Sequence, residues 1–342
     1  MRPTPSLLSR AAFLLLGTLL AASVLAAPAS ARPAARFRII DLGTLGGANS
    51  QALAVNNHGQ VVGTSDVRPG SEDSHAFLWA DGRMRDLGTF GGPISAALDI
   101  NDHGQVVGAA DTASFVGHAF LWAHGRMRDL GTLGGTFSVA TGINDQGVVS
   151  GYSATPSGAT HAFLWRDGHM NDLGLGDSST ANDLNNHGQI VGGYPSPLGG
   201  FHAYRWQHGA ATPIDTQSNY SEAFAINARG QAAGWAGFPG SDFFHAALFS
   251  HGQTIDLGTL AGAFSKANGI DHDGRVVGQS DSPTGPLHAF LWQGGRMTDL
   301  GALSDQGMNG GSSANDINDH GLIAGSSAVT TGDSAHAVLW RG

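Results

Sequence analysis

The sequence contains no cysteine, one lysine and two glutamates, and only 13% of its 342 residues are charged. The absence of cysteine excludes disulfides and lipid attachment through a thiol. Soluble chains average about 25% charged residues, and long helices and coiled coils are rich in Glu and Lys. The composition therefore excludes a helical bundle or a coiled coil.

Glycine and apolar residues are abundant instead. The chain has 52 glycines, about twice the share that is usual in soluble proteins. Its hydrophobic content of 41% is too high for a disordered chain. We therefore expect an all-β protein with many turns, because glycine adopts the backbone conformations that tight turns require.

The N-terminal segment has the features of a secretory signal peptide. Arg2 and Arg10 precede an apolar run over residues 11–27, and small residues follow up to Ala31. The alternative is an uncleaved anchor, but this run is short for a hydrocarbon layer about 30 Å thick. We expect a secreted or periplasmic protein that consists of a signal peptide (residues 1–31), a short linker (residues 32–36) and one domain (residues 37–342).

The charge of the chain bears on its partners. The net charge is −10, and cleavage would remove two arginines and no acid. Phosphate backbones and anionic membranes bind basic surfaces, and no second apolar stretch approaches the length of a membrane span. We expect a monomer without a cofactor that binds neither nucleic acid nor membrane.

Three markers recur seven times in a fixed order, at intervals of 41 to 48 residues for the first of them. The first is His-Ala-Phe-Leu-Trp or a variant, which begins at His75, His118, His161, His202, His245, His288 and His336. The second is Asp-Leu-Gly at Asp41, Asp86, Asp129, Asp172, Asp256 and Asp299, with Ile214, Asp215 and Thr216 in the remaining place. The third resembles Ile-Asn-Asp-His-Gly-Gln-Val-Val-Gly and ends at Gly63, Gly108, Gly151, Gly192, Gly234, Gly278 and Gly325.

Each repeat is expected to form four short antiparallel strands. In the second repeat these strands are residues 95–101, 105–110, 118–122 and 126–130. Turn segments that end in glycine join the first strand to the second and the third to the fourth, which predicts tight hairpins. Four strands within about 40 to 50 residues are typical of a β-propeller blade.

The two ends of the domain complement each other. Residues 37–43 supply a fourth strand without the first three, and residues 312–340 supply three strands without a fourth. The sequence therefore predicts a seven-bladed β-propeller of four-stranded antiparallel blades, whose ring is closed by the N-terminal strand completing the last blade. Such closure removes two exposed sheet edges. An open β-solenoid is the alternative, and it predicts no complementary ends.

The repeat also predicts which side carries a ligand. The connections between the second and third strands, and between one repeat and the next, vary in sequence, as at residues 67–74, 237–244 and 304–311. Functional residues are often found on loops that a rigid frame holds. We expect any ligand at this variable rim and the adjoining mouth of the central channel.

The recurring segments resemble the HAF family of bacterial extracellular repeat proteins. The resemblance covers residues 37–342 and rests on His-Ala-Phe-Leu-Trp, Asp-Leu-Gly-Thr-Leu-Gly-Gly and Ile-Asn-x-x-Gly-x-Val-Val-Gly in fixed order. It implies an exported repeat protein and assigns no catalytic or binding residue. The fourth and fifth repeats depart from the pattern, at residues 202–206 and 218–222.

All sixteen histidines occupy repeat positions, so none is singled out as a catalytic base. The histidine that begins each third strand is expected to bond a neighbouring strand, for example at the aspartate of Asp-Leu-Gly. A zinc site needs three or four converging ligands, whereas the repeat distributes these side chains among different blades. Asp66, Asp111 and Asp281, at one position of three repeats, are weak candidates for calcium.

Motifs for covalent catalysis are missing. There is no cysteine and no Gly-x-Ser-x-Gly at a strand–helix junction, and Glu72 and Glu222 lie in different repeats. Glycine runs such as residues 131–135 are expected to be crossings between blades rather than phosphate loops, which open a helix. The sequence favours a protein that is not an enzyme and leaves the question open.

The fifth repeat departs from the others through an aromatic cluster. The cluster comprises Trp235, Phe238, Phe243 and Phe244, with Tyr194 and Tyr220 nearby in sequence. Such side chains stack on sugar rings or anchor protein partners, and the alternative is that they fill space beneath a longer loop. The sequence thus predicts an exported non-catalytic protein that binds a carbohydrate or an extracellular protein. Two alternatives remain: a propeller hydrolase or lyase that acts on polysaccharide through rim aspartates, and a purely structural component of the cell envelope.

Overall fold

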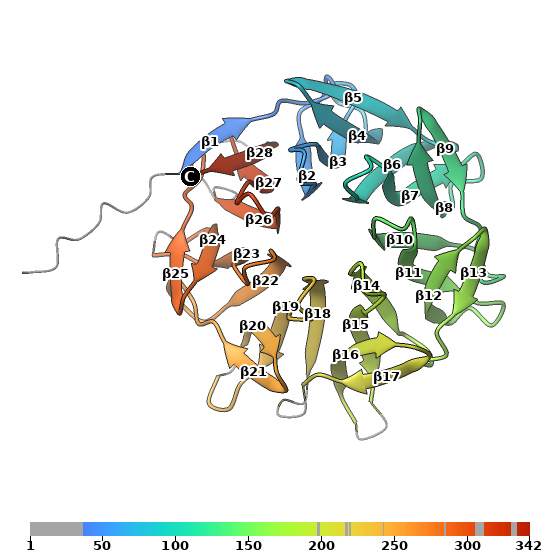
Figure 1. The fold of residues 1–342 in the computed structure, drawn as a ribbon. Coiled ribbons are helices and arrows are strands. Elements are labelled where there is room, and N and C mark those ends of the chain that lie inside the picture. The colour runs from blue at the N-terminus through green and yellow to red at the C-terminus, as the bar shows by residue number, and fades with distance from the viewer. Residues whose placement is uncertain are drawn as a thin grey trace, which may run out of the picture. The chain divides into compact units, whose positions relative to one another are not determined.

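The computed structural model describes residues 37–196, 199–215, 218, 220–241, 243–283, 285–304, 311–329 and 334–342 (Figure 1). Every regular element within these ranges is a β-strand, so the predicted all-β class is confirmed. Within the same ranges, no helix has the length and apolar character needed to cross a membrane. The predicted signal peptide and linker lie outside the described residues.

The strands follow the order of the sequence repeat, after an initial strand β1 (Arg38–Asp41). The first strands of the repeats are β2 (Ser50–Val55), β6 (Gly91–Ile100), β10 (Ser138–Ile143), β14 (Thr180–Leu184), β18 (Ser221–Ile226), β22 (Ser265–Ile270) and β26 (Ser312–Ile317). The second strands are β3 (Val61–Asp66), β7 (Val106–Thr112), β11 (Val149–Ala154), β15 (Ile190–Pro195), β19 (Ala232–Gly237), β23 (Val276–Asp281) and β27 (Ile323–Ala328).

The third strands are β4 (Ser74–Ala80), β8 (Gly117–Ala123), β12 (Thr160–Arg166), β16 (Phe201–Gln207), β20 (Phe244–Ser250), β24 (Leu287–Gln293) and β28 (Ala335–Arg341). The fourth strands are β5 (Arg83–Gly88), β9 (Arg126–Asp129), β13 (His169–Asp172), β17 (Ala210–Pro213), β21 (Gln253–Asp256) and β25 (Arg296–Asp299). In Figure 1 the first strands lie nearest the centre of the arrangement and the fourth strands lie outermost.

Hydrogen bonds join the strands into antiparallel four-stranded units. Four separate sheets are β10–β13, β14–β17, β18–β21 and β22–β25, and a fifth has the order β1-β28-β27-β26. The remaining sheet has eight strands and consists of β2–β5 and β6–β9, which a single parallel pair, Ser74 with Ile94, connects. The predicted four-stranded antiparallel unit is therefore present.

Turn chemistry explains why each repeat forms hairpins. In the second repeat, the N–H of Gly104 donates to the carbonyl oxygen of Asn101 at 3.0 Å, and the N–H of Asn101 donates to Gln105 at 3.1 Å. The turn from β8 to β9 places His124 and Gly125 at φ angles of 51° and 80°. Two successive positive φ angles match the twist of a two-residue hairpin.

Apolar side chains pack between neighbouring sheets. One cluster joins Ala54 and Val62 of the first repeat to Ile100, Val106 and Phe120 of the second, and clusters of the same composition recur along the chain. Burial of one such large side chain stabilises the fold by roughly 1.5–3 kcal/mol. Each sheet therefore depends on its neighbours for stability.

The first and last strands of the described chain pair with each other. Strand β1 runs antiparallel to β28, with Ile40 opposite Leu339. The N–H of Ala337 donates to Ser50 Oγ at 2.8 Å, and the same bond joins the third strand of each preceding repeat to the serine of the next. The contact between the two ends thus uses the same bonds as the contacts between consecutive repeats.

The histidine that begins each third strand pairs with an aspartate in six repeats. Distances from Nδ1 to the nearer carboxylate oxygen are 2.7 to 3.0 Å in the pairs His75–Asp86, His118–Asp129, His161–Asp172, His245–Asp256, His288–Asp299 and His336–Asp41. The same aspartates accept the N–H of the glycine two residues later, as Asp86 does from Gly88 at 2.7 Å. One carboxylate therefore fixes both the third strand and the exit from the fourth.

The fourth repeat differs from the sequence prediction. Its register places Pro213 opposite Tyr204, at the position where the third repeat pairs Asp172 with Phe163. Asp215 therefore does not fill the Asp-Leu-Gly position. Its buried carboxylate accepts a hydrogen bond from Thr254 of the next repeat at 3.0 Å. The prediction was wrong because spacing alone does not reveal a shift of two residues.

Candidate functional site

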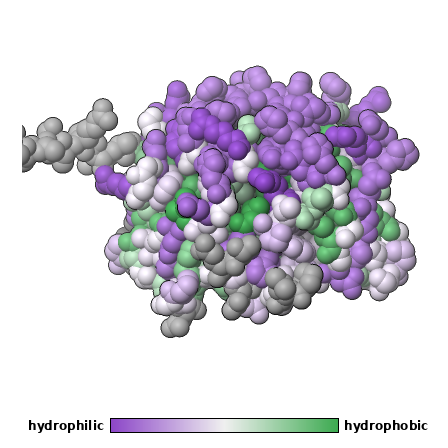
Figure 2. All heavy atoms as spheres, turned by 60° about the horizontal axis from the view of Figure 1, so that its bottom comes forward, coloured by the Kyte–Doolittle hydropathy of each residue, from purple (hydrophilic) through white to green (hydrophobic). Residues whose placement is uncertain are grey.

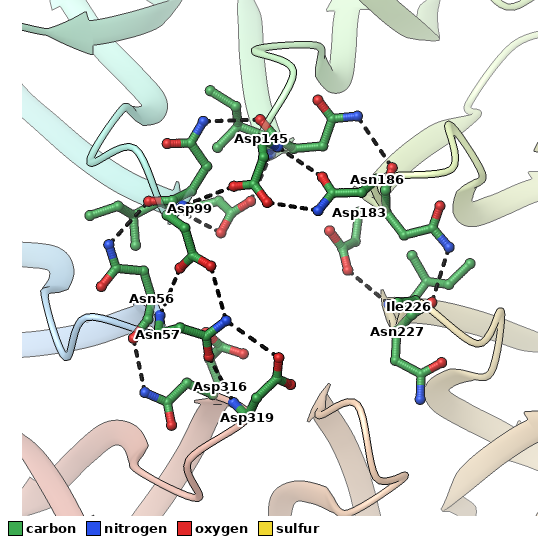
Figure 3. A pocket seen from close by; sticks show the side chains of 18 of the residues that line it. Asn56, Asn57, Asp99, Asp145, Asp183, Asn186, Ile226, Asn227, Asp316 and Asp319 are labelled. Atoms are coloured by element: carbon green, nitrogen blue, oxygen red, sulfur yellow. Dashed lines mark hydrogen bonds between the residues drawn. The ribbon is translucent and has the colours of Figure 1, made fainter.

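A cavity of about 230 Å³ lies where the first strands end and turn into the second strands (Figure 3). Its walls come from the ends of β2, β6, β10, β14, β18, β22 and β26 and from the turns after them. Because these strands lie innermost, we call the cavity the channel mouth. It lies on the turn side, opposite the variable rim where the sequence analysis places a ligand.

Three aspartates in the turns surround the opening: Asp102, Asp145 and Asp319. Asn57 donates its N–H to Asp102 Oδ1 at 2.8 Å and its Nδ2 to Asp102 Oδ2 at 3.0 Å. The N–H of Asp102 in turn donates to Asp145 at 3.0 Å, and Asn186 Nδ2 donates to the other Asp145 oxygen at 2.7 Å. Bonds between repeats therefore fix these carboxylates around the opening.

Buried asparagines form a second layer that links one repeat to the next. Each donates Nδ2 to the carbonyl oxygen of the equivalent residue in the following repeat, at 2.9 to 3.2 Å, and the donors are Asn56, Asn101, Asn144, Asn185, Asn227 and Asn318. The sixth repeat has Asp271, whose carboxylate accepts a bond from Arg275 instead. The bond from Asn318 to Asn56 joins the last repeat to the first.

Three further aspartates, Asp99, Asp183 and Asp316, lie deeper in the mouth and are partly exposed to it. Their Oδ1 atoms accept the N–H of the next residue at 2.6 to 2.8 Å. Their Oδ2 atoms accept an N–H from the following repeat at 2.7 to 2.9 Å, and the donors are Ile143, Ile226 and Val55. Each deep carboxylate thus connects two repeats.

The number of deep aspartates has a geometric reason. The other repeats have Ala54, Gly142, Ala225 or Gly269 at this position. One carboxylate serves two N–H groups, so three aspartates serve six of the seven positions. A Cβ at Gly269 would lie 2.9 Å from Cα of Asp316 in the next repeat. A small residue is therefore needed at this position in the repeat that precedes an aspartate.

Burial raises the pKa of all three deep carboxyl groups. Burial, with repulsion from Asp316 and Asp145, raises the pKa of Asp99 from 3.8 to about 7, although two backbone N–H groups oppose the change. Burial raises the pKa of Asp316 to about 6. Burial and the charge of Asp99 hold the pKa of Asp183 well above 3.8. Asp99 and Asp316 therefore exchange protons near neutral pH.

The mouth has a strong excess of negative groups. Six aspartates line it, whereas His272 is the one lining residue that can become a cation. Carboxylates around a concave opening focus a negative potential that attracts cations. In the part of the chain that the structure describes, no group of three acidic or imidazole side chains is arranged to hold a metal ion. Figure 2 shows hydrophilic residues over the upper face of the domain and apolar residues along its side.

Comparison with known proteins identifies the fold. No protein-family model matches the chain, and no match was found among curated proteins. The β-propeller domain of the trilobed protease from Pyrococcus furiosus has a TM-score of 0.57 and 10% identity, over 86% of this chain and 93% of that domain. The chain is a β-propeller.

Two other similar structures are acylaminoacyl peptidases. The enzyme from Pyrococcus horikoshii has a TM-score of 0.56 and 11% sequence identity, and the similarity covers 86% of the present chain. An acylaminoacyl peptidase in complex with Z-Gly-Gly-Phe-chloromethyl ketone has a TM-score of 0.53 and 12% identity. The propeller spans 51% of the length of each of these peptidases.

These structures correct the function predicted from the sequence. They are peptidases and a propeller domain of a protease, so the prediction of a non-catalytic scaffold for carbohydrate or protein was wrong. The alternatives, a polysaccharide hydrolase and an envelope component, have no counterpart among them. The repeat determines the frame of a propeller, and it contains no information about the molecule that the propeller handles.

The structure brings part of the predicted aromatic cluster together. The rings of Trp235 and Phe244 lie 4.3 Å apart, and Phe238 packs on the core between the fourth and fifth repeats, with its ring 6.0 Å from that of His245. Phe244 nevertheless remains 41% exposed. These three aromatic residues lie outside the channel mouth.

The other three aromatic residues are separate from that contact. Tyr194 packs edge-on against Tyr204 within its own sheet, with 5.5 Å between the ring centroids. Tyr220 and Phe243 are 52% and 56% exposed. None of the three lines the channel mouth. The structure therefore does not gather the six residues into one site.

The rim aspartates hold loops in place. Asp66 accepts hydrogen bonds from the N–H and Nδ2 of Asn49 at 3.1 and 2.8 Å. Asp281 accepts the N–H groups of Ala263 and Phe264, both at 2.9 Å. Asp66 and Asp111 lie on β3 and β7 of the eight-stranded sheet, whereas Asp281 lies on β23 of another sheet. The described residues contain no group of three such side chains that could hold a metal ion, so the structure does not bring the three candidates for calcium together.

Sequence reasoning missed the six aspartates of the mouth because it assigned most of them to turns. A signal was available at one position of the first strands, where aspartate recurs at Asp99, Asp183 and Asp316 between alanine or glycine in the other repeats. An aspartate at a strand position that holds alanine or glycine in the other repeats is a better indicator of a site than the turn aspartates are.

Proposed function

We propose that this β-propeller works together with a peptidase catalytic unit, and that its channel mouth receives the N-terminal ammonium group of a peptide. The observation that carries the proposal is the charge of the mouth, where six aspartates face a single ionisable base. The likeness to the propellers of a trilobed protease and of acylaminoacyl peptidases supports the choice of a peptide over other cations.

The chemistry of the mouth suits an ammonium group. An ammonium group donates three hydrogen bonds, and carboxylates are its strongest acceptors. Asp102, Asp145 and Asp319 surround the opening, and the three deep aspartates lie below it. A cavity of about 230 Å³ admits the end of an extended peptide and excludes a folded domain.

We also propose that the propeller is a closed ring of seven blades. The pairing of β1 with β28 and the bond from Asn318 to Asn56 support closure. A core cluster that joins Ala52 and Phe77 to Ala324 and Ala337 also supports it, because it has the composition of the clusters between consecutive repeats. A closed ring would keep the six aspartates at fixed positions around one opening.

Export and family complete the proposal. The basic, apolar and small-residue segments of residues 1–31 support secretion, since they follow the order of a signal peptide. The seven His-Ala-Phe-type segments support membership of the HAF family. We propose a secreted or periplasmic monomer that handles peptides outside the cytoplasm.

Binding of a short peptide tests the role of the mouth. We expect Ala-Ala-Phe-amide to bind and its N-acetylated form to bind at least about tenfold more weakly, because acetylation removes the charge. The triple variant Asp102→Asn, Asp145→Asn, Asp319→Asn keeps an oxygen acceptor at each position and should lose about the same factor. Isothermal titration calorimetry measures both effects.

The control is Asp81→Asn, at an exposed turn residue outside the mouth. This variant should bind Ala-Ala-Phe-amide as the unmodified protein does. Equal affinity for the free and the acetylated peptide would overturn the proposal, and so would unchanged affinity in the triple variant.

A further inference from the structure

The only lysine of the chain and one of its two glutamates occupy the same repeat position on neighbouring strands. Glu222 lies on β18 and Lys266 on β22, each directly after the first serine of its strand. The other repeats have uncharged residues at this position: Gln51, Ala96, Val139, Thr180 and Ser313. A pair of opposite charges therefore occurs once at this repeat position. The position lies three residues before that of the deep aspartates along the first strand, as Ala96 does before Asp99.

Contacts across the boundary between repeats hold the glutamate. Its Oε1 accepts hydrogen bonds from Thr180 Oγ1 at 3.2 Å and from Asn182 Nδ2 at 2.9 Å. A Cβ at Gly193 would lie 3.1 Å from Cγ of Glu222, so the glycine leaves room for the side chain. The carboxylate is therefore fixed on the wall.

The lysine has an aromatic neighbour instead of a carboxylate partner. Its Nζ lies 3.9 Å from the centre of the Phe224 ring. Among the described residues, no carboxylate oxygen lies within 4.0 Å of this ammonium group. Burial lowers the pKa of Lys266, and the charge of Glu222 acts in the opposite direction through space. The two charges thus stand on one wall without forming an ion pair.

Apolar side chains lie at the same levels on other first strands. Leu53, Leu98 and Val139 are half-buried on β2, β6 and β10, which Figure 1 places across the centre from β18 and β22. A half-buried charge that no opposite charge neutralises is costly. A ligand that carries both charges and an apolar group would neutralise one wall and cover the other.

We propose that Glu222 and Lys266 form a binding site for a zwitterion of the amino-acid type, with the α-ammonium group on Glu222, the α-carboxylate on Lys266 and the side chain against Phe224 and the apolar residues. This site is separate from the channel mouth. It uses two charges of opposite sign, whereas the mouth uses acidic groups alone, so each of the two proposals can fail independently.

Three probes test the requirement for both charges. L-Leucine should bind at least about tenfold more tightly than L-leucinamide, which lacks the carboxylate, and than N-acetyl-L-leucine, which lacks the ammonium group. Lys266→Met and Glu222→Gln should each weaken leucine binding by at least about tenfold. Gln51→Ala, at the same position of another repeat, is the control and should leave the affinity unchanged. Binding of leucine that neither variant weakens, or equal binding of the three probes, overturns the proposal.

A second measurement does not require a substitution. Reductive ¹³C-methylation labels Lys266 as the only lysine and preserves its positive charge. Addition of leucine should shift the NMR signal of the labelled side chain, and addition of Ala-Ala-Phe-amide at the mouth should not. An unmoved signal at saturating leucine contradicts the site, even if the variants fail to fold.

Discussion

Replacement of Gly108 by alanine is expected to lower the free energy of unfolding by about 3 kcal/mol or more, the scale of severe overpacking. A Cβ at Gly108 would lie 1.9 Å from the carbonyl oxygen of Ala96 on the neighbouring strand. Because backbone atoms supply that contact, no side-chain rotation relieves it. Urea unfolding followed by tryptophan fluorescence measures the loss.

The matched control is Gly117→Ala in the same repeat. There the nearest atom to a new Cβ is the end of the Asp111 side chain, at 3.7 Å, and φ is not positive. This variant should change the free energy of unfolding by less than about 1 kcal/mol. Equal stability of the two variants would show that the close approach of the first and second strands is not essential.

The same contact explains the third sequence marker. At each of its final glycines, an added Cβ would lie within 2.0 Å of a backbone carbonyl oxygen of the first strand in the same repeat. These glycines are Gly63, Gly108, Gly151, Gly192, Gly234, Gly278 and Gly325. In every repeat the pairing of the first strand with the second shifts register at this level. Glycine is required there by backbone contact rather than by a positive φ angle.

Stability is expected to fall as the pH rises from about 4 to about 7. The pKa of Asp99 is about 7 and that of Asp316 about 6 in the folded protein, against 3.8 when unfolded. Above pH 4 the unfolded chain has released these protons while the folded protein still binds them, so each step up in pH favours unfolding until about pH 7. The total change is on the order of a few kcal/mol, since one pKa unit corresponds to about 1.4 kcal/mol.

The variant Asp99→Ala, Asp316→Ala isolates this effect. Alanine at these positions copies Ala54 and Ala225 of other repeats, so the backbone can accept it. The charges of Asp316 and Asp145 act on Asp99, and the charge of Asp319 acts on Asp316, and all of them oppose ionisation.

His161 changes stability in the same direction as the two aspartates. Its hydrogen bonds to Asp172 and Asp177 raise its pKa above 6.5, so its contribution to stability is lost as the pH rises above 6.5 and passes through the raised pKa. Because His161 is present in both the unmodified protein and the double variant, its contribution cancels when their pH-dependent losses of stability are compared. Thermal unfolding at pH 5 and pH 8 should show a smaller loss in the variant, and an identical loss in both proteins would contradict the assignment.

The local structure could be predicted well because the motif that marks each strand recurs in several repeats. His-Ala-Phe-Leu-Trp marked third strands and Asp-Leu-Gly marked the ends of fourth strands, and the expected histidine–aspartate bond joins the two markers in six repeats. The exception was Asp215, because Pro213 takes the position of the aspartate and a single copy gave no second example for comparison.

The site could not be predicted in the same way. Asp99 and Asp316 are far apart in the sequence and meet only because the first strands surround one opening. Variation between repeats drew attention to the loops around Trp235, whereas the mouth is built from turns that hardly vary. The charges at Glu222 and Lys266 were visible as rare residue types, but their common position on neighbouring strands becomes meaningful only in the fold.

Proton release on peptide binding tests the role of the channel mouth most directly. Calorimetric titration of Ala-Ala-Phe-amide at pH 6.5, in two buffers with different heats of ionisation, gives the number of protons exchanged. If the ammonium group binds among the aspartates, it lowers their pKa values, and the complex must release protons to the buffer. Heats that differ between the buffers in the direction of proton release are the predicted result. Binding without proton exchange, or with proton uptake, would contradict the proposed place of the ammonium group.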